Sequence, residues 1–282
     1  KTVNRVHMSR AALGILSSAH FGSALATGFI VGIPLLRGTA DLLTIGLSVF
    51  AVITITMFGF VVNDLFDVER DSINKPYRPL ASGTITAKQS KHFALLTVFA
   101  SAIAIAILLM ISWKAVFLLL YMLFYYVYNY INKYAVLLKN VFIALGFLMP
   151  FLYVLSMLDK IEENTLIIIS TLFYFLYREL LMDVNDKKGD LEAGYRTIPN
   201  RVSDHMVNSL IAIFWSFSVI ALSAHCFLHG SSLFTGLLGA MVFIMVIQNL
   251  VWKNMNLSAS SMRILLMSMW IPMVASPFLL VI

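Results

Sequence analysis

The chain has 282 residues, of which 60% are hydrophobic and only 12% are charged, and its formal net charge is +6. An ordinary soluble domain carries about 25% charged residues, so this composition excludes a soluble globular protein and indicates an integral membrane protein. The positive charges form no basic stripe, so nucleic acid is not an expected partner.

Apolar runs recur along the chain that are long enough to cross a hydrocarbon layer about 30 Å thick. They predict nine membrane-spanning helices, in residues 12–36, 42–62, 93–112, 115–132, 137–158, 164–182, 206–228, 233–251 and 262–282. Only a short turn near Ser112 to Lys114 separates the third run from the fourth. Because nine helices leave no room for a soluble domain, we expect residues 1–282 to form one all-α polytopic membrane domain.

The basic residues give an independent test of this map. If the N-terminus is cytoplasmic, all 20 Lys and Arg residues except Arg37, Lys114 and Lys160 fall in inside segments. Short cytoplasmic segments of membrane proteins carry such a positive excess. An odd number of spans therefore predicts a cytoplasmic N-terminus and an external C-terminus.

The first unusual polar segment follows the second apolar run and reads NDLFDVERD. Asp64, Asp67 and Asp71 stand at i, i+3 and i+7, which places three carboxylates on one face of a helix. Such a stripe needs a compensating cation, and its oxygen ligands suit Mg²⁺. The segment opens a cytoplasmic loop of about residues 63–92, which ends where Thr86 is the expected N-cap of the third span.

The second segment follows the sixth apolar run and repeats the spacing. Asp183, Asp186 and Asp190 lie in DVNDKKGD, within a cytoplasmic loop of about residues 183–205. Carboxylates at helix ends are often merely solvated charges, but two matched trios are hard to explain in that way. We expect two Mg²⁺ ions that coordinate one polyphosphate between the two carboxylate faces.

These segments and their flanks resemble the UbiA superfamily of intramembrane prenyltransferases. The resemblance rests on NDLFDVERD with the following NKPYRPLASG, and on DVNDKKGD followed by Gly194, Arg196, Thr197 and Pro199. It covers nearly the whole chain. It implies nine transmembrane helices around a cytoplasm-facing active-site cavity, and Mg²⁺-assisted transfer of an isoprenyl group from its diphosphate to an acceptor.

The matching positions give the expected site residues. Catalytic roles are assigned to Asp64, Asp67, Asp71, Asp183, Asp186 and Lys133. Metal binding is assigned to Asn63, Asp64, Asp67, Asp71, Asp183, Asp186 and Asp190. Diphosphate binding is assigned to Asn63, Lys75, Arg78, Lys187 and Arg196, although these basic residues could also serve only as topology determinants.

One departure concerns a YxxxK element that the family often shows after its fourth helix. Tyr128 precedes Lys133, and Tyr134 precedes Lys139, at a spacing of five residues rather than four. We favour Lys133, because its distance from Asn140 resembles the family's pattern. The role of a tyrosine at this site is therefore open.

The chemistry agrees with the residues. Magnesium ions with Lys and Arg stabilise a leaving diphosphate, and a pocket between membrane helices keeps an allyl cation from water. Its apolar tail can lie among the helices or open toward membrane lipid. The aromatic residues of the fourth span can stabilise that cation, although a membrane-interface belt and helix packing explain them better. They are Tyr121, Phe124, Tyr125, Tyr126, Tyr128 and Tyr130.

Several functions remain open at this point. We favour transfer to a small nucleophilic acceptor of an aromatic type. The alternatives are a terpene cyclase of the same superfamily, and prenylation of a non-aromatic lipid head group, which the stretch Arg178-Glu179 suggests. A divalent-ion-coupled transporter is disfavoured, because its carboxylates would lie near the bilayer midplane rather than at the cytoplasmic helix ends.

Overall fold

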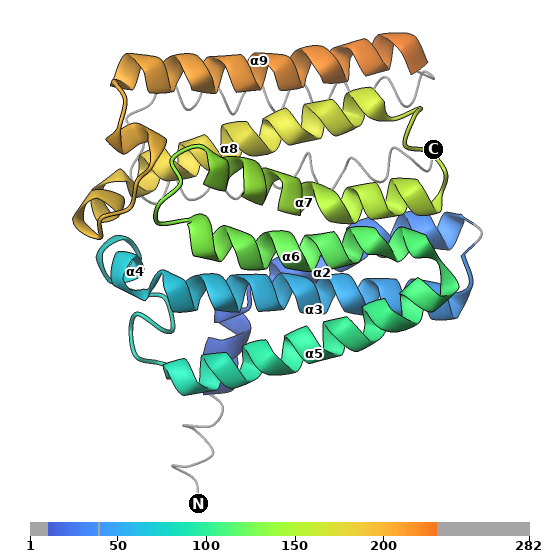
Figure 1. Cartoon of the computed structure of the whole chain (residues 1–282), viewed down its shortest axis with the longest axis horizontal. Coiled ribbons are helices and arrows are strands. Elements are labelled where there is room, and N and C mark those ends of the chain that lie inside the picture. The colour runs from blue at the N-terminus through green and yellow to red at the C-terminus, as the bar shows by residue number, and fades with distance from the viewer. Residues whose placement is uncertain (1–10, 39, 230–282) are drawn as a thin grey trace, which may run out of the picture.

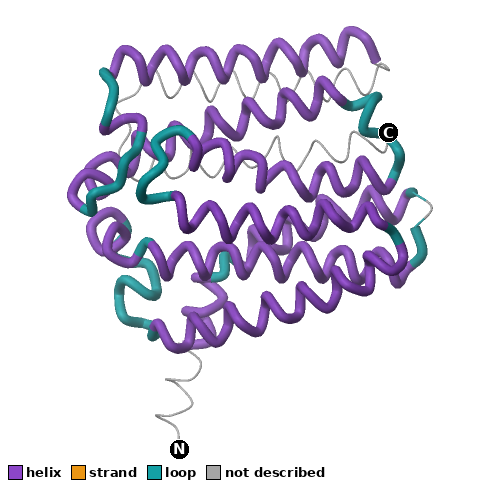
Figure 2. The backbone as a smooth tube through the Cα atoms, in the orientation of Figure 1, coloured by secondary structure: helices purple, strands orange, loops and turns teal. Residues whose placement is uncertain are grey.

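A computed structural model describes residues 11–38 and 40–229, in which every regular element is helical (Figure 2). Two expected spans, 233–251 and 262–282, lie outside these described residues, as does the expected external C-terminus. The first expected span is bent by 49° between a short helix, Ala11–Ser18, and α2 (Phe21–Arg37). His20 lies at the bend with a φ of 46°.

The other expected spans that fall within the described residues correspond to helices. They are α3 (Leu42–Phe66), α5 (Ala87–Ile111), η1 (Trp113–Ala115) with α6 (Val116–Ile131), α7 (Leu138–Met157), α8 (Thr165–Glu192) and α9 (Asp204–His229). Two further short helices connect them, α4 (Val68–Asn74) and η2 (Ile198–Asn200). Six described helices are long and apolar enough to cross a membrane, or seven if the bent pair counts as one span.

The helix ends agree with the local sequence signals. Thr86 caps α5 in a reciprocal pair of hydrogen bonds with Gln89, as the sequence predicts. Asp41 caps α3 by accepting a hydrogen bond from the Thr44 backbone N–H. The end of α8 is followed by Gly194 with a φ of 73°, the left-handed conformation that glycine adopts at helix C-termini.

The helices form one row with an added layer (Figure 1). From α5 at one edge, the row runs through α3, α6, α7 and α8 to α9 at the other edge, with α2 behind α3. The connections after α3, α6 and α8 all lie at one end of the row, where α4 also lies. Both aspartate segments therefore meet at the same end, as the predicted topology requires.

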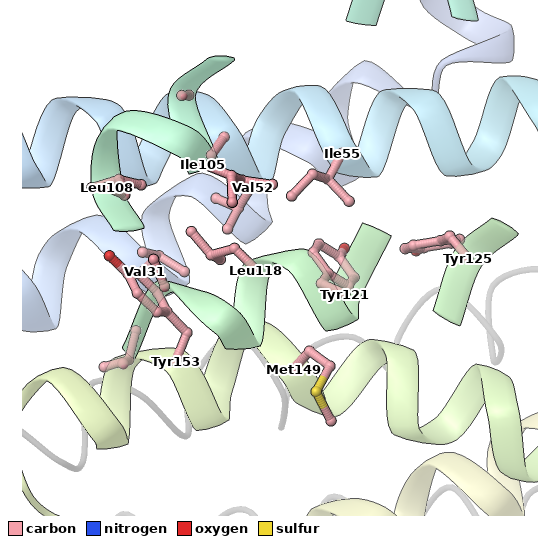
Figure 3. Close-up of a cluster of buried hydrophobic side chains, with 14 of the residues drawn as sticks. Val31, Val52, Ile55, Ile105, Leu108, Leu118, Tyr121, Tyr125, Met149 and Tyr153 are labelled. Atoms are coloured by element: carbon pink, nitrogen blue, oxygen red, sulfur yellow. The ribbon is translucent and has the colours of Figure 1, made fainter. Parts of the chain in front are cut away.

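The largest hydrophobic cluster joins α2, α3, α5, α6 and α7 (Figure 3). Its buried side chains include Val31, Val52, Ile55, Leu108, Leu118, Met149 and Tyr153. Gly59 of α3 faces the ring of Tyr125, and a Cβ atom there would overlap that ring. Small residues let membrane helices approach closely, so Gly59 fixes the contact between α3 and α6.

Hydroxyl groups join the helices inside this apolar frame. Ser48 of α3 lies 2.6 Å from the hydroxyl of Tyr153 on α7, and Thr56 lies 2.9 Å from that of Tyr121 on α6. Such interhelical hydrogen bonds contribute to packing where apolar burial gives little drive. Tyr121 thus has a packing role, whereas Tyr126 and Tyr130 are exposed on the helix surface.

The orientation in the membrane follows from the charge bias and remains a prediction. A topology reporter inserted between Lys75 and Arg78 should report a cytoplasmic location, because the basic residues lie mainly at that end. The same reporter between Glu162 and Glu163, in the turn before α8, should report the opposite side. Matching signals from the two insertions would contradict the orientation.

Candidate active site

The first aspartate segment does not form one straight helix. α3 continues through Asn63 and Asp64 to Phe66, the chain bends at Asp67 with φ −97° and ψ 7°, and α4 then starts at Val68. The expectation of one continuous helical face is therefore corrected: the break at Asp67 turns α4 away from the axis of α3.

Arg78 holds the two sides of this bend together. Its Nη1 atom lies 2.9 Å from Oδ1 of Asp64 and 2.6 Å from Oδ2 of Asp71. Ser18 donates a further hydrogen bond of 2.6 Å to Asp64. Burial raises the pKa of Asp71, while Arg78 and Lys75 act in the opposite direction. The guanidinium thus neutralises two buried carboxylates at once.

The second segment lies on a helix rather than in the loop that the sequence suggested. α8 is helical through Glu192, so Asp183, Asp186 and Asp190 share one face. Asp183 is bound by Lys139 and by the Asn140 amide at 3.0 Å, both from the start of α7. Lys75 reaches Asp186 at 2.5 Å from the first loop. Basic residues from two other elements therefore face this helix.

Arg70 of α4 connects the two segments directly. Its guanidinium pairs with Asp67, and its Nη1 atom lies 3.6 Å from Oδ1 of Asp190. The same guanidinium lies over the ring of Tyr195, 5.0 Å from the centroid, and the Tyr195 hydroxyl donates a 2.9 Å hydrogen bond to Asp67. Arg70 is 7% exposed and both aspartates are fully buried, so this is an interior ion-pair network.

Asn74, the last residue of α4, forms a second connection. Its amide donates to the Asp186 carbonyl at 2.9 Å and accepts from the Gly189 N–H at 3.0 Å. A Cβ atom on Gly189 would overlap the Asn74 side chain. The absence of a side chain at Gly189 therefore lets α4 pack against α8.

Replacing Gly189 with alanine should disrupt both hydrogen bonds of Asn74 and shift Lys75 from Asp186. A clash with a buried polar contact costs about 1–3 kcal/mol, which thermal unfolding in detergent would measure. Gly46→Ala is the matched control, since nothing lies within 4 Å of its Cβ position in α3. That variant should be neutral or slightly stabilised. Equal stability of the two variants would contradict the contact.

A cavity of about 630 Å³ opens between α2, α3, α6, α7, α8 and the first loop. Its basic lining consists of Arg70, Lys75, Arg78, Lys139 and Arg178, and its carboxylates are Glu179, Asp183 and Asp186. Its aromatic lining consists of Phe60, Tyr77, Tyr125, Tyr128 and Phe147. Among the described lining residues, cations outnumber carboxylates, so this part of the cavity suits an anionic group with an apolar extension.

The expected site residues divide into three groups. Those that line the cavity are Asn63, Lys75, Arg78, Asp183 and Asp186. Those that lie buried beside it, paired with Arg70 or Arg78, are Asp64, Asp67, Asp71 and Asp190. Those that lie outside the lining are Lys133, Lys187 and Arg196.

The three expected site residues outside the cavity lining contact other parts of the protein. Lys133 is 40% exposed, lies 4.0 Å from Glu69 and does not reach the cavity. Lys187 pairs with Asp204 at 3.0 Å on the exposed surface. Arg196 is exposed, and its backbone N–H donates to the Lys133 carbonyl at 3.1 Å. The sequence favoured Lys133 over Lys139, but in the structure it is Lys139 that contacts an aspartate of the site.

Sequence reasoning did not assign Arg70, Asn74 or Lys139 to the site. Arg70 and Asn74 lie within or directly after the first aspartate segment, so their positions were a usable signal. Lys139 was considered on spacing alone. Its location in the first turn of α7, one residue before Asn140, is what brings it to Asp183.

The carboxylates are chemically suited to Mg²⁺ but are engaged by basic residues. Among the described residues, no three His, Cys, Asp or Glu side chains converge on one point as a metal site. Within the same residues, Oδ1 of Asp71 and both carboxylate oxygens of Asp190 are buried and accept no hydrogen bond. Buried oxygens without donors are suitable metal ligands, so the residues fit Mg²⁺ once Arg and Lys turn to another anion.

Comparison with known proteins gives a consistent result. The model of the UbiA prenyltransferase family matches residues 24–271. A digeranylgeranylglyceryl phosphate synthase of Sulfurisphaera tokodaii is 30% identical over 200 residues, which cover 64% of this chain and 70% of that protein. The synthase of the same name from Pyrococcus horikoshii is 30% identical over 164 residues, and the match spans 58% of each chain.

Solved structures share the fold. A UbiA homologue from Archaeoglobus fulgidus, bound to GPP and Mg²⁺, superposes with a TM-score of 0.74. The match covers 95% of this chain and 99% of that one, at 18% sequence identity. The likeness shows that the chain has the fold of this homologue.

Proposed function

The chain belongs to the UbiA prenyltransferase family, and we propose that it transfers an isoprenyl group from its diphosphate to a hydroxyl group of a glycerophosphate-type lipid. As a member of this family it is an integral-membrane prenyltransferase. The sequence favoured an aromatic acceptor, but the names of the relatives specify a glyceryl phosphate. They support the alternative, a non-aromatic lipid head group.

The observation that carries the proposal is the charge of the cavity wall. Lys75 and Lys139 reach Asp186 and Asp183 at one level of α8, and Arg78 lines the same wall. A diphosphate entering here accepts hydrogen bonds from these three cations and releases their carboxylates. Charge-assisted hydrogen bonds of this kind are the strong ones, and they stabilise the negative charge of the leaving group.

The released carboxylates are the proposed magnesium ligands. Asp64, Asp71, Asp183 and Asp186 would act with Asn63 and, once Arg70 also turns to the diphosphate, with Asp67 and Asp190. Bound there, Mg²⁺ neutralises charge that develops on the leaving diphosphate. The A. fulgidus homologue bound to GPP and Mg²⁺ supports the use of Mg²⁺ with an isoprenyl diphosphate, and both the ligand residues and the presence of two ions stay predictions.

The aromatic part of the cavity suits the isoprenyl chain. Tyr125 and Phe147 line it and face each other edge to face, with centroids 6.0 Å apart. Their rings exclude water and can stabilise positive charge at the allylic carbon. In the transfer, the bond from this carbon to the diphosphate oxygen breaks first, and the allyl cation that results forms a bond to the acceptor oxygen. Loss of the hydroxyl proton completes the reaction.

Product analysis tests the proposed acceptor. Purified protein with Mg²⁺ and isotope-labelled isoprenyl diphosphates of several lengths should yield a labelled ether lipid when a glycerophosphate lipid with a free hydroxyl is supplied. Asp183→Asn should form no product, because it removes one charge from the proposed metal site. Labelled product from an aromatic acceptor, with none from the glycerophosphate lipid, would overturn the acceptor assignment.

A further inference from the structure

Glu179 extends the carboxylate face of α8 by one turn. Glu179, Asp183, Asp186 and Asp190 stand at i, i+4, i+7 and i+11 on one continuous helix, Thr165–Glu192. Glu179 lies about 6 Å deeper along the axis than Asp183, inside the predicted apolar span 164–182. An ionisable group at such a depth is expensive, and a functional role is its default explanation.

The surroundings of Glu179 differ from those of the aspartates. Asp183 and Asp186 are bound by lysines from other elements, whereas Oε1 of Glu179 accepts a 2.5 Å hydrogen bond from its neighbour Arg178. In the described part of the chain, no hydrogen bond engages Oε2 of Glu179. Both Glu179 and Arg178 line the cavity. One carboxylate oxygen is therefore held by a cation, and the other is available to a ligand.

The proposed reaction needs a proton acceptor beside the reacting hydroxyl group. An alcohol oxygen that forms a bond to carbon must lose its proton, and a cavity that protects a cation from water cannot rely on water to accept it. The cavity-lining aspartates Asp183 and Asp186 face the diphosphate end. Of the other titratable side chains in the described lining, His20 is stacked on the ring of Phe60, with centroids 4.2 Å apart, and the phenols of Tyr77, Tyr125 and Tyr128 are neutral and weakly basic near pH 7. Among the described residues, Glu179 is the cavity-lining carboxylate that lies on the side away from the proposed diphosphate position.

We propose that the Glu179 carboxylate is the general base that accepts the proton of the acceptor hydroxyl. This inference rests on the proposed transfer to an alcohol. The bond from the allylic carbon to the diphosphate oxygen breaks, and the acceptor oxygen then bonds to the allylic cation. The electron pair of the broken bond leaves with the diphosphate, and the hydroxyl proton passes to Oε2 of Glu179. Arg178 donates a hydrogen bond to the other carboxylate oxygen, Oε1, and so holds the carboxylate in place for the transfer.

Glu179→Gln tests this role, because glutamine preserves the size and hydrogen bonding of glutamate but is not basic. General-base catalysis contributes about 10²–10⁴-fold, so transfer to the hydroxyl lipid should fall by that factor. Binding of the isoprenyl diphosphate, measured with Mg²⁺ in the absence of acceptor, should be unchanged. An unchanged transfer rate would overturn the proposal.

A thiol analogue of the acceptor distinguishes a general-base role of Glu179 from a structural or metal-binding role. With –SH in place of the reacting –OH, and at a pH of about 8.5, much of the acceptor is already a thiolate and needs no base. Glu179→Gln should then transfer the isoprenyl group at a rate within about tenfold of wild type. A merely structural role predicts equal losses with both acceptors, and a metal-ligand role predicts a raised Mg²⁺ requirement. Either outcome would contradict the proposal.

Two further variants complete the design. Any loss of activity in His20→Asn should be similar with the hydroxyl and the thiol acceptor. If instead the thiol acceptor restores the activity of His20→Asn but not that of Glu179→Gln, the imidazole of His20 is the general base and the proposal is wrong. If Glu179→Gln fails to bind the donor, Glu179→Asp replaces it, and a selective loss with the hydroxyl acceptor is again expected. If the wild-type protein converts no glycerophosphate lipid, the proposed function itself is refuted. This outcome is distinguishable from a loss of activity that is confined to a variant.

Discussion

Replacing Asp186 with asparagine should lower the rate of isoprenyl transfer by about 10²–10³-fold or more, the usual effect of removing one preorganised electrostatic partner. The variant leaves Lys75 without its carboxylate and removes one proposed magnesium ligand. Transfer of a labelled isoprenyl group in a single turnover measures the effect, and thermal unfolding checks the fold. Chelation of Mg²⁺ with EDTA should abolish wild-type turnover, and added Mg²⁺ should restore it.

Asp204→Asn is the matched control for this prediction. Asp204 also pairs with a lysine, Lys187, but its side chain is 83% exposed and lies outside the cavity lining. Its replacement should leave transfer unchanged, since exposed ion pairs contribute little. Full activity of Asp186→Asn, or of the chelated wild type, would refute the proposed metal site.

The second large effect is expected on stability rather than on chemistry. Arg70→Ala removes the cation shared by Asp67 and Asp190, and both carboxylates are fully buried. Breaking a buried ion pair by removing one partner costs about 3–5 kcal/mol, because the remaining charge is left uncompensated. Thermal unfolding in detergent should show a large fall in the unfolding temperature.

Glu69→Ala serves as the comparison for Arg70→Ala, because it lies next to Arg70 on α4. Glu69 is 73% exposed and lies 4.0 Å from Lys133, so its removal should cost about 0–1 kcal/mol. Similar unfolding temperatures for the two variants would contradict the interior network.

The sequence predicted the helices better than it predicted their ends. Apolar runs located every span that falls within the described residues, because length and hydropathy suffice for that purpose. The end of α8 was placed too early, since its charged residues were read as a loop. No proline intervenes before Pro199, so the helix continues until Gly194 provides a left-handed terminus.

The pairing within the site could not be predicted in the same way. The spacing of the aspartates indicated two carboxylate clusters, but their cations come from distant positions. Lys75 is 111 residues from Asp186, and Lys139 is 44 residues from Asp183. Such contacts depend on which face α7 and the first loop present to α8. The choice between Lys133 and Lys139 needed that geometry, because sequence spacing did not separate them.

The most direct measurement of the central claim is diphosphate release with and without an acceptor. Purified protein with Mg²⁺ and an isoprenyl diphosphate should release little diphosphate until a glycerophosphate lipid is added, because an ionised donor held away from water recombines with its leaving group. Addition of the lipid should then release diphosphate in step with labelled ether product. Rapid release without any acceptor, together with a cyclic hydrocarbon, would instead identify a cyclase and contradict the proposed transfer.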